Sequence, residues 1–469
     1  MRTSISILTL PLGTKLQIKV PLSRGIRGMF KNQQNTPLNP LSRGEFKTGC
    51  VRTHIFQKMR YSILLVIVLL VFPDTGRSQT ITKELQSYIN FAIANNPELK
   101  AMDLKYQQAL EIVPQAKALP DPSFSAGVFI RSIETRLGAQ KAKLSLSQMF
   151  PWFGTLGAKE QQASLQAHAQ YLKYLDAKNR TEMKVSLSYL DLLLIDRKIF
   201  FTQKRVEVLG LLEKQSLIQF ENNQSSMVNV LYVQMLKEEL ILKLGSFRDK
   251  KQTFKSTFNK LLNRDFTATV NLPEDDSFMQ QQVLPDFDIS FNNHARINSW
   301  ETMKEAGAFG EKAAKLNGLP KFGVGIDYAI IAKRSDMNVA DNGKDAIMPM
   351  ISISIPLFRK KYKSAVKVNQ LKQVQFEHLK QEELNRLQME KQKAFEEYNT
   401  GIRDVKVYEN LLAKARQSFE ILTSNYETSS GKYEEVLNMQ QKIWIYGQKQ
   451  IEAKVIIQKS IAKFQYLGM

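Results

Sequence analysis

The longest stretch of the chain without a proline sets the strongest limit on its fold. From Thr155 to about Leu217 apolar residues recur at the spacing of one helix face, with only two glycines and no proline. At 1.5 Å per residue, a helix of about 60 residues would be about 90 Å long. An ordinary globular domain has no use for such a helix, whereas a coiled coil or a helical repeat does. Residues 361–424 predict a second long helix of the same kind.

Each long helix is followed by a short polar turn and a second, shorter helix. The turns are ENNQSS (221–226) and TSSGK (428–432), and the shorter helices are predicted at 227–262 and 433–464. Strands are predicted upstream of each long helix, at 124–136, 141–150, 321–331 and 348–358.

The two halves of the chain carry the same pattern. LSLSQMFPWFG (144–154) and ISISIPLFRKK (351–361) both place an alternating strand, a proline and an aromatic residue before a long helix, and Pro151 and Pro356 lie 205 residues apart. Further on, FENNQSSMVNVLYVQ (220–234) and YETSSGKYEEVLNMQ (426–440) align without gaps at an offset of 206. We interpret this as an internal duplication, in which each half is a short helix, two strands, a very long helix and a shorter helix.

The strands have two chemically different faces. Ile351, Ile353 and Ile355 fall on one face, and Ser352 and Ser354 fall on the other. Aromatic residues gather at the strand ends, where the interfacial girdle of a membrane barrel would lie: Phe150, Trp152, Phe153 and Phe358. Four strands cannot close a barrel and lipid does not tolerate an open edge, so several protomers would have to contribute strands. A soluble sheet with one wet face shows the same alternation, and this alternative stays open.

The amino-terminal region has the pattern of an export signal preceded by additional sequence. Of the net charge of +21, residues 1–58 carry +9, from ten Lys/Arg and one acid. Met59 is followed by a short basic segment, an apolar run at 63–72 and small residues at 76–78, as in a signal peptide. We therefore expect the mature protein to begin at or near Gln79.

The predicted organisation has five parts. They are an upstream extension (1–58), a signal peptide (59–78), a first repeat (79–263), a linker (264–288) and a second repeat (289–469). The single cysteine, Cys50, lies in the upstream extension. The mature chain is therefore expected to have no disulfide and no thiolate metal site.

Residue patterns typical of catalysis are missing from the sequence. The four histidines, His54, His168, His294 and His378, show no metal-binding or nucleophile spacing, so we interpret each as a surface helix or loop residue. Met149, Met348 and Met350 are interpreted as apolar filler rather than copper ligands. We expect no enzyme activity, no cofactor, no metal site and no nucleic-acid partner.

The sequence resembles the TolC-like outer-membrane efflux proteins, also called outer membrane factors, over residues 80–467. The pieces that carry the resemblance are LPDPSFSAGVF, LSQMFPWFGTLGAKEQQA, ISISIPLFRKKYKSA and YETSSGKYEEVLNMQ. The resemblance implies a mainly α fold with a small membrane β-barrel, in which three protomers each give four strands to one barrel and their long helices form a tunnel through the periplasm. It implies a homotrimeric exit channel in the outer membrane, joined through a periplasmic adaptor to an inner-membrane efflux pump. The strand-proline-helix segments are most similar to the branch that serves heavy-metal cation pumps.

The family narrows its tunnel at the periplasmic tips of the helices. The resemblance places this gate at Tyr426, Glu435 and Asn438, with Asn229 as the counterpart in the first half. Asn438 and Asn229 stand where the family has acids, so Glu435 alone keeps the charge. Three Glu435 carboxylates in a ring would attract cations, whereas a solvated Glu435 on a helix face would not affect conduction.

Two further functions stay open from the sequence. The chain could serve as the outer-membrane duct of a type I protein-secretion system or of a multidrug pump. A soluble periplasmic coiled-coil scaffold would explain the long helices without any membrane.

Overall fold

The computed structural model describes residues 83–273, 287–427 and 432–469, which all belong to one compact unit, Arg77–Met469. The predicted upstream extension (1–58) and signal peptide (59–78) lie outside the described residues, as do residues 274–286 of the predicted linker.

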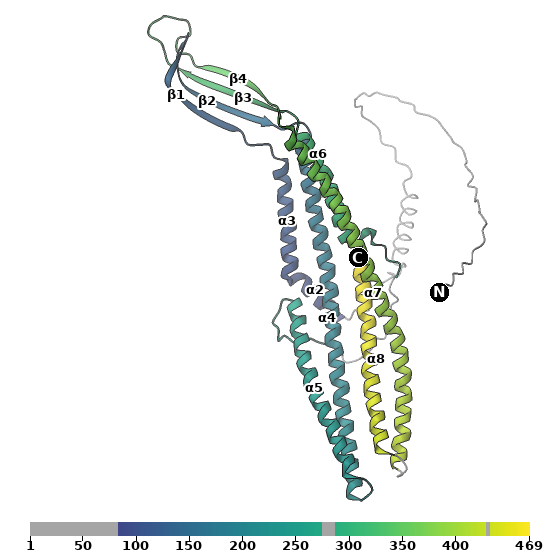
Figure 1. Cartoon of the computed structure of the whole chain (residues 1–469). Coiled ribbons are helices and arrows are strands. Elements are labelled where there is room, and N and C mark those ends of the chain that lie inside the picture. Colours follow the sequence, from purple (N-terminus) through teal and green to yellow (C-terminus); the bar gives the residue numbers. More distant parts are fainter. Residues whose placement is uncertain (1–82, 274–286, 428–431) are drawn as a thin grey trace, which may run out of the picture. The chain divides into compact units, whose positions relative to one another are not determined.

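The described chain is mainly helical and contains one small sheet (Figure 1). In chain order the elements are α2 (Lys83–Asn95), α3 (Pro97–Lys117), β1 (Ser123–Thr135), β2 (Gly138–Phe150), α4 (Thr155–Glu221), α5 (Met227–Leu261), the 3-10 turn η2 (Phe291–Asn293), α6 (Ala295–Asn317), β3 (Lys321–Ile331), β4 (Ala346–Ser354), α7 (Arg359–Glu427) and α8 (Tyr433–Leu467). The predicted long helices are therefore present, and at 67 and 69 residues both α4 and α7 are longer than expected.

Local sequence explains several element ends. Asn96 caps α3, because its side-chain oxygen accepts hydrogen bonds from the backbone N–H of Glu98 (2.8 Å) and Leu99 (3.4 Å), and Pro97 occupies the first helical position. The strand predicted at 348–358 is wrong at its carboxyl end, since β4 stops at Ser354, two residues before Pro356. Proline has no N–H for the ladder, and the backbone before it starts the turn into α7.

All four strands form one antiparallel sheet in the order β1-β2-β3-β4. The pairs Phe124↔Leu146, Leu146↔Ile326 and Ile326↔Pro349 define one row across the whole sheet. The central β2–β3 pairing joins the two halves of the chain. β4 is an edge strand of this sheet, where a proline such as Pro349 is better tolerated than in a central strand.

The short helix α6 packs against both long helices, α4 and α7, and α8 packs against α7 and α4. Gly310 permits the close approach of α6, because a Cβ at this position would lie 2.6 Å from Asn369 Oδ1 on α7 and 2.9 Å from Gln162 Nε2 on α4. Within the described ranges, no helix combines the length and the apolar character needed to cross a bilayer.

The element order helix, strand, strand, long helix, shorter helix occurs twice, and α5 and α8 both have 35 residues. This order agrees with the predicted duplication, whose origin in a repeated sequence remains a prediction.

Candidate functional site

The sheet has one apolar face that the described protein leaves open to solvent. The row Phe124–Leu146–Ile326 lies on this face, with exposed fractions of 68, 49 and 47 %. Two of the predicted lipid-facing residues continue it, since Ile351 and Ile353 of β4 are 84 and 56 % exposed. The third, Ile355, is 64 % exposed but lies one residue beyond the end of β4. Val324 and Phe322 pair with Ile351 and Ile353 on the same face. So large an exposed apolar surface needs a partner, either lipid or protein.

The opposite face of the sheet is polar. Asp327 forms an ion pair with Lys143 (2.5 Å) and accepts a hydrogen bond from Ser145. Ser123 and Ser147 share a hydrogen bond of 2.7 Å, and the Ser352 hydroxyl lies 3.6 Å from the sulfur of Met149 across Gly323. The period of two in the sequence therefore separates a mainly apolar from a mainly polar surface. Exceptions are Gln148 on the apolar face and Met149, Met348 and Met350 on the polar one.

Three of the four predicted interfacial aromatics gather at one end of the sheet. The Trp152 ring lies 6.2 Å from Phe153 and 5.5 Å from Phe322, and Phe150 pairs with Phe322 in the strand register. The fourth, Phe358, is 85 % exposed just before α7. Phe322 completes this cluster but was not predicted from the sequence. It lies at the start of β3 and has no aromatic neighbour in the sequence.

The opposite end of the long helices carries the predicted gate residues. Tyr426 is only 8 % exposed, stacks on Tyr433 with ring centroids 4.9 Å apart, and donates a hydrogen bond to the Gln219 side chain of α4. Tyr433 donates to the Leu212 carbonyl oxygen at 2.7 Å. Burial raises the pKa of both tyrosines, which therefore stay protonated as donors. Tyr426 thus ties the end of α7 to α4 within one protomer.

The other predicted gate residues do not join this buried cluster. Glu435 and Asn438 are exposed on α8, and in the described part of the chain the Glu435 carboxylate makes no ion pair. Asn229 is half-buried on α5 and donates to Ser225 Oγ at 2.9 Å. Asn223, which stands at a glycine position of the family pattern, has φ of 58°, a left-handed conformation that asparagine tolerates. Whether these residues form a ring depends on neighbouring protomers and remains a prediction.

Besides the Tyr426 contact, a second contact joins the α4–α5 hairpin to the α7–α8 hairpin, and it was not predicted from the sequence. The Trp444 ring of α8 lies 4.8 Å from the guanidinium carbon of Arg205 on α4 and 4.5 Å from Lys243 Nζ on α5. Burial lowers the pKa of Arg205 to about 10, and Glu239 opposes this effect. The Trp444 N–H points to Thr202 Oγ1 at 3.4 Å. Such cation–π pairs join residues far apart in the chain, so no local pattern reveals them.

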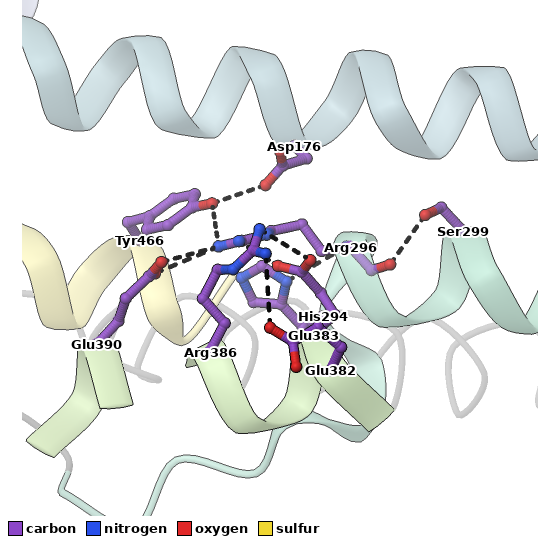
Figure 2. Close-up of polar contacts among 9 residues, drawn as sticks. All are labelled: Asp176, His294, Arg296, Ser299, Glu382, Glu383, Arg386, Glu390 and Tyr466. Carbon is purple, nitrogen blue, oxygen red and sulfur yellow. Dashed lines mark hydrogen bonds and ion pairs between the residues drawn. The ribbon is translucent and has the colours of Figure 1, made fainter. Parts of the chain in front are cut away.

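Polar and charged side chains from four helices meet in a cluster nearer the middle of the long helices (Figure 2). Arg296 of α6 forms ion pairs with Glu383 and Glu390 of α7, the latter at 3.2 Å. Tyr466 of α8 donates to Asp176 of α4 at 2.8 Å. The Tyr466–Asp176 bond connects the second half of the chain to the first. The burial of Arg296 and Glu383 makes the loss of either partner costly.

His294 lies in the same cluster, and its interpretation as a surface residue is wrong. It is 4 % exposed, and its Nδ1 accepts a hydrogen bond from the Arg296 N–H at 3.3 Å as the N-cap of α6. No local pattern indicates this burial, because the helices that cover His294 come from distant segments. His168 and His378 are exposed as expected.

We expect the stability of the folded chain to fall with pH below about 6.5, the ordinary pKa of histidine. Burial lowers the pKa of His294, Arg296 lowers it further, and Asp176 opposes them. Between the lowered pKa and 6.5 the unfolded chain binds more protons, so stability is complete above this window and is lost as pH falls, by at most about 1.4 kcal/mol per pH unit.

Thermal unfolding of the detergent-solubilised protein between pH 7.5 and 5 measures this effect. His294→Asn keeps a side-chain acceptor at the N-cap but does not titrate, and should flatten the pH dependence. His168→Asn, at an exposed site, should leave it as in the unmodified chain. An unchanged slope in His294→Asn would assign the pH dependence to other groups.

In the described ranges, no three His, Cys, Asp or Glu side chains are placed so that they could hold a metal ion.

Comparison with known proteins identifies solved structures with a similar fold. No protein-family model and no curated protein matches the chain. Among solved structures, the chain is similar to the outer membrane protein VceC from Vibrio cholerae, with a TM-score of 0.66 and 15 % identity over 82 % of this chain and 96 % of that one. It is similar to the outer-membrane channel OprN (TM-score 0.69, 12 % identity, 82 % and 90 % covered) and to the Campylobacter jejuni CmeC outer membrane channel (0.66, 14 %, 82 % and 86 %). The chain therefore has the fold of the outer-membrane channel proteins, which confirms, at the level of the fold, the resemblance predicted from its sequence.

Proposed function

We propose that this chain is the outer-membrane channel subunit of a tripartite efflux system. It would act as a passive exit duct for substrates delivered by an inner-membrane pump through a periplasmic adaptor. The observation that carries the proposal is the two-faced sheet, with an exposed apolar face on one side and ion-paired polar residues on the other, attached to helices about 100 Å long. Solved channels of the same fold support it.

The sheet edges favour a homo-oligomer. β1 and β4 each have one strand neighbour in the described sheet, so each presents a row of unpaired backbone groups. In lipid these groups must be paired, and β1 of one protomer next to β4 of another would achieve this. Three copies would supply twelve strands, within the range of closed membrane barrels.

The far end of the first hairpin offers a surface for further contacts. Leu211, Val228, Leu231 and Met235 are 67, 67, 49 and 59 % exposed on α4 and α5. Leu211 also lines a groove of about 470 Å³ between these helices. Apolar surface of this kind is typical of protein interfaces. Neighbouring protomers and a periplasmic adaptor are the partners that the proposed function requires there.

In the proposed system the inner-membrane pump, rather than this chain, selects the exported substrate. Heavy-metal cations are the substrate class favoured by the sequence resemblance, and a multidrug or protein-secretion duct is the alternative within transport. A soluble scaffold is the alternative outside transport, and the exposed apolar sheet face speaks against it.

Two measurements test the proposal. Density fractionation should place the full chain with outer membranes, and the purified protein should conduct ions in planar bilayers. Recovery in the soluble periplasmic fraction would favour the scaffold instead.

The exposed position of Glu435 gives a test of the predicted gate. Glu435→Gln should lower the cation preference of the channel without changing its pore size, because up to three negative charges leave a narrow ring. The reversal potential under a salt gradient measures this preference. Glu434→Gln is the matched control, since Glu434 is also exposed in the first turn of α8 but points in another direction around the helix. Equal effects of the two substitutions would mean that Glu435 is an ordinary solvated residue.

A further inference from the structure

A hollow lies where the helices meet the sheet, and small residues create it. Gly310, Ala313 and Ala314 of α6 and Ala365 of α7 line it, and its volume is about 420 Å³. The side chains of Ala313, Ala314 and Ala365 end at Cβ and leave space between α6 and α7. The space directly over Gly310 is taken up by the side chains of Gln162 and Asn369. The hollow is large enough for a phosphate group with part of its organic substituent.

Three lysines border this hollow and no acid does. Lys159 comes from α4, Lys321 is the first residue of β3, and Lys361 lies in the first turn of α7. In the described part of the chain none of the three has an acidic partner; Lys361 only lies 6.0 Å from the Tyr362 ring centre.

Glu160 and Glu311, which adjoin Lys159 and Gly310 in the sequence, are already neutralised by other lysines. Glu160 pairs with Lys117 at 2.9 Å, and Glu311 pairs with Lys315 at 2.7 Å. Three positive charges around the hollow therefore remain uncompensated, an arrangement that like-charge repulsion disfavours unless an anion binds.

A neutral donor and a helix amino terminus also favour an anion in the hollow. The Gln162 amide nitrogen lies over Gly310, within 2.9 Å of where a Cβ would stand, and its side chain makes no hydrogen bond in the described residues. The first turn of α7 borders the hollow through Lys361, and helix amino termini attract anions.

The position of the hollow along the molecule points to the source of the anion. Lys321 immediately precedes Phe322, which belongs to the aromatic cluster with Trp152 and Phe153 at the end of the apolar face. Aromatic residues of this kind mark the level of lipid headgroups in membrane barrels. Lys321, at the sheet end of the hollow, is therefore one residue beyond that level, and the rest of the hollow lies on the side of the helices.

We propose that this hollow binds the phosphate of an anionic phospholipid at the periplasmic surface of the outer membrane, through Lys159, Lys321 and Lys361. The lipid source rests on the proposed function, whereas the phosphate chemistry rests on the lysines and the hollow alone. A bound headgroup would fix the depth of the sheet in the bilayer where it joins the rigid helices.

Native mass spectrometry of the full chain released from non-ionic detergent micelles tests the proposal, with added phosphatidylglycerol as the probe and phosphatidylcholine as the zwitterionic reference. The variant Lys159→Gln/Lys321→Gln/Lys361→Gln should weaken phosphatidylglycerol binding about tenfold or more, as expected for the loss of charge-assisted hydrogen bonds. The control Lys312→Gln/Lys367→Gln/Lys372→Gln removes the same charge from exposed lysines of α6 and α7 outside the hollow and should change binding by less than about twofold. Ala365→Leu fills the hollow without changing charge and should also weaken binding.

The outcomes separate the components of the proposal. Equal weakening in the two triple variants, or an unchanged affinity in Ala365→Leu, would overturn it in favour of unspecific attraction. If inorganic phosphate or glycerol phosphate displaces the lipid at equal concentration, the site is one for soluble anions and the lipid assignment is wrong. Lysine-dependent phosphate binding by a chain that does not fractionate with outer membranes would contradict the proposed function but keep the anion site.

Discussion

Replacing Ile326 with lysine is expected to stop the chain from accumulating in the outer membrane. Ile326 is the sixth of eleven residues in β3, lies on the exposed apolar face and pairs with Leu146 and Pro349 in the middle of the sheet. A lysine on the lipid face costs about 2–4 kcal/mol at the bilayer midplane, and a trimer would bear this cost three times. Density fractionation followed by immunodetection measures the loss.

The strand register supplies two controls for this substitution. Ser147→Lys places the same charge on the polar face, next to Leu146 at nearly the same depth, and should be tolerated. Ile353→Lys should have a smaller effect, of about 0–1 kcal/mol, because Ile353 pairs with Phe322 beside the aromatic cluster rather than at the midplane. Tolerance of Ile326→Lys together with Ser147→Lys would favour a soluble sheet.

Truncation of Tyr426 to alanine is expected to loosen the tip of the helices and to raise the single-channel conductance in planar bilayers. The Tyr426 ring is buried among Leu209, Leu212 and Tyr433, and removing a buried aromatic side chain costs about 3–5 kcal/mol. The change also leaves the Gln219 side chain without its donor. Because the cluster joins α7 and α8 to α4, its loss would favour an outward movement of the hairpin, which needs such a two-state interface.

Two further variants separate the effect of the Tyr426 ring on conductance from that of its hydroxyl and provide a matched control. Tyr426→Phe keeps the packing and removes only the bond to Gln219, so its conductance should lie between those of the unmodified protein and Tyr426→Ala. Phe220→Ala is the matched truncation at the aligned aromatic residue of the first half, which is 39 % exposed, and should change conductance less. A conductance in Tyr426→Ala equal to that of the unmodified channel would show that this cluster does not hold the tip closed.

The sequence by itself determined the elements and their order. Proline-free stretches with helical periodicity predicted α4, α5, α7 and α8, because a helix forms from contacts three and four residues apart, which a local pattern records. Strict alternation predicted the two faces of the strands for the same reason, since the side-chain period of a strand is two. The register is different: only pairing with β3 showed that Ile353 lies near the sheet end, whereas Ile326 lies at its middle.

Only the tertiary structure decided which polar and aromatic residues meet. His294 is buried because α4, α7 and α8 cover the start of α6, and Asp176 and Tyr466, which bond to each other there, are 290 residues apart. Tyr426 packs against α4 instead of projecting freely, and Lys159, Lys321 and Lys361 surround one hollow although they come from three elements. Such groupings depend on how distant helices pack, and a single sequence does not record packing at that range. Local patterns thus determine the kinds of surfaces this protein can present, and the packing of its helices decides where the buried charges, the Tyr426 cluster and the basic hollow lie.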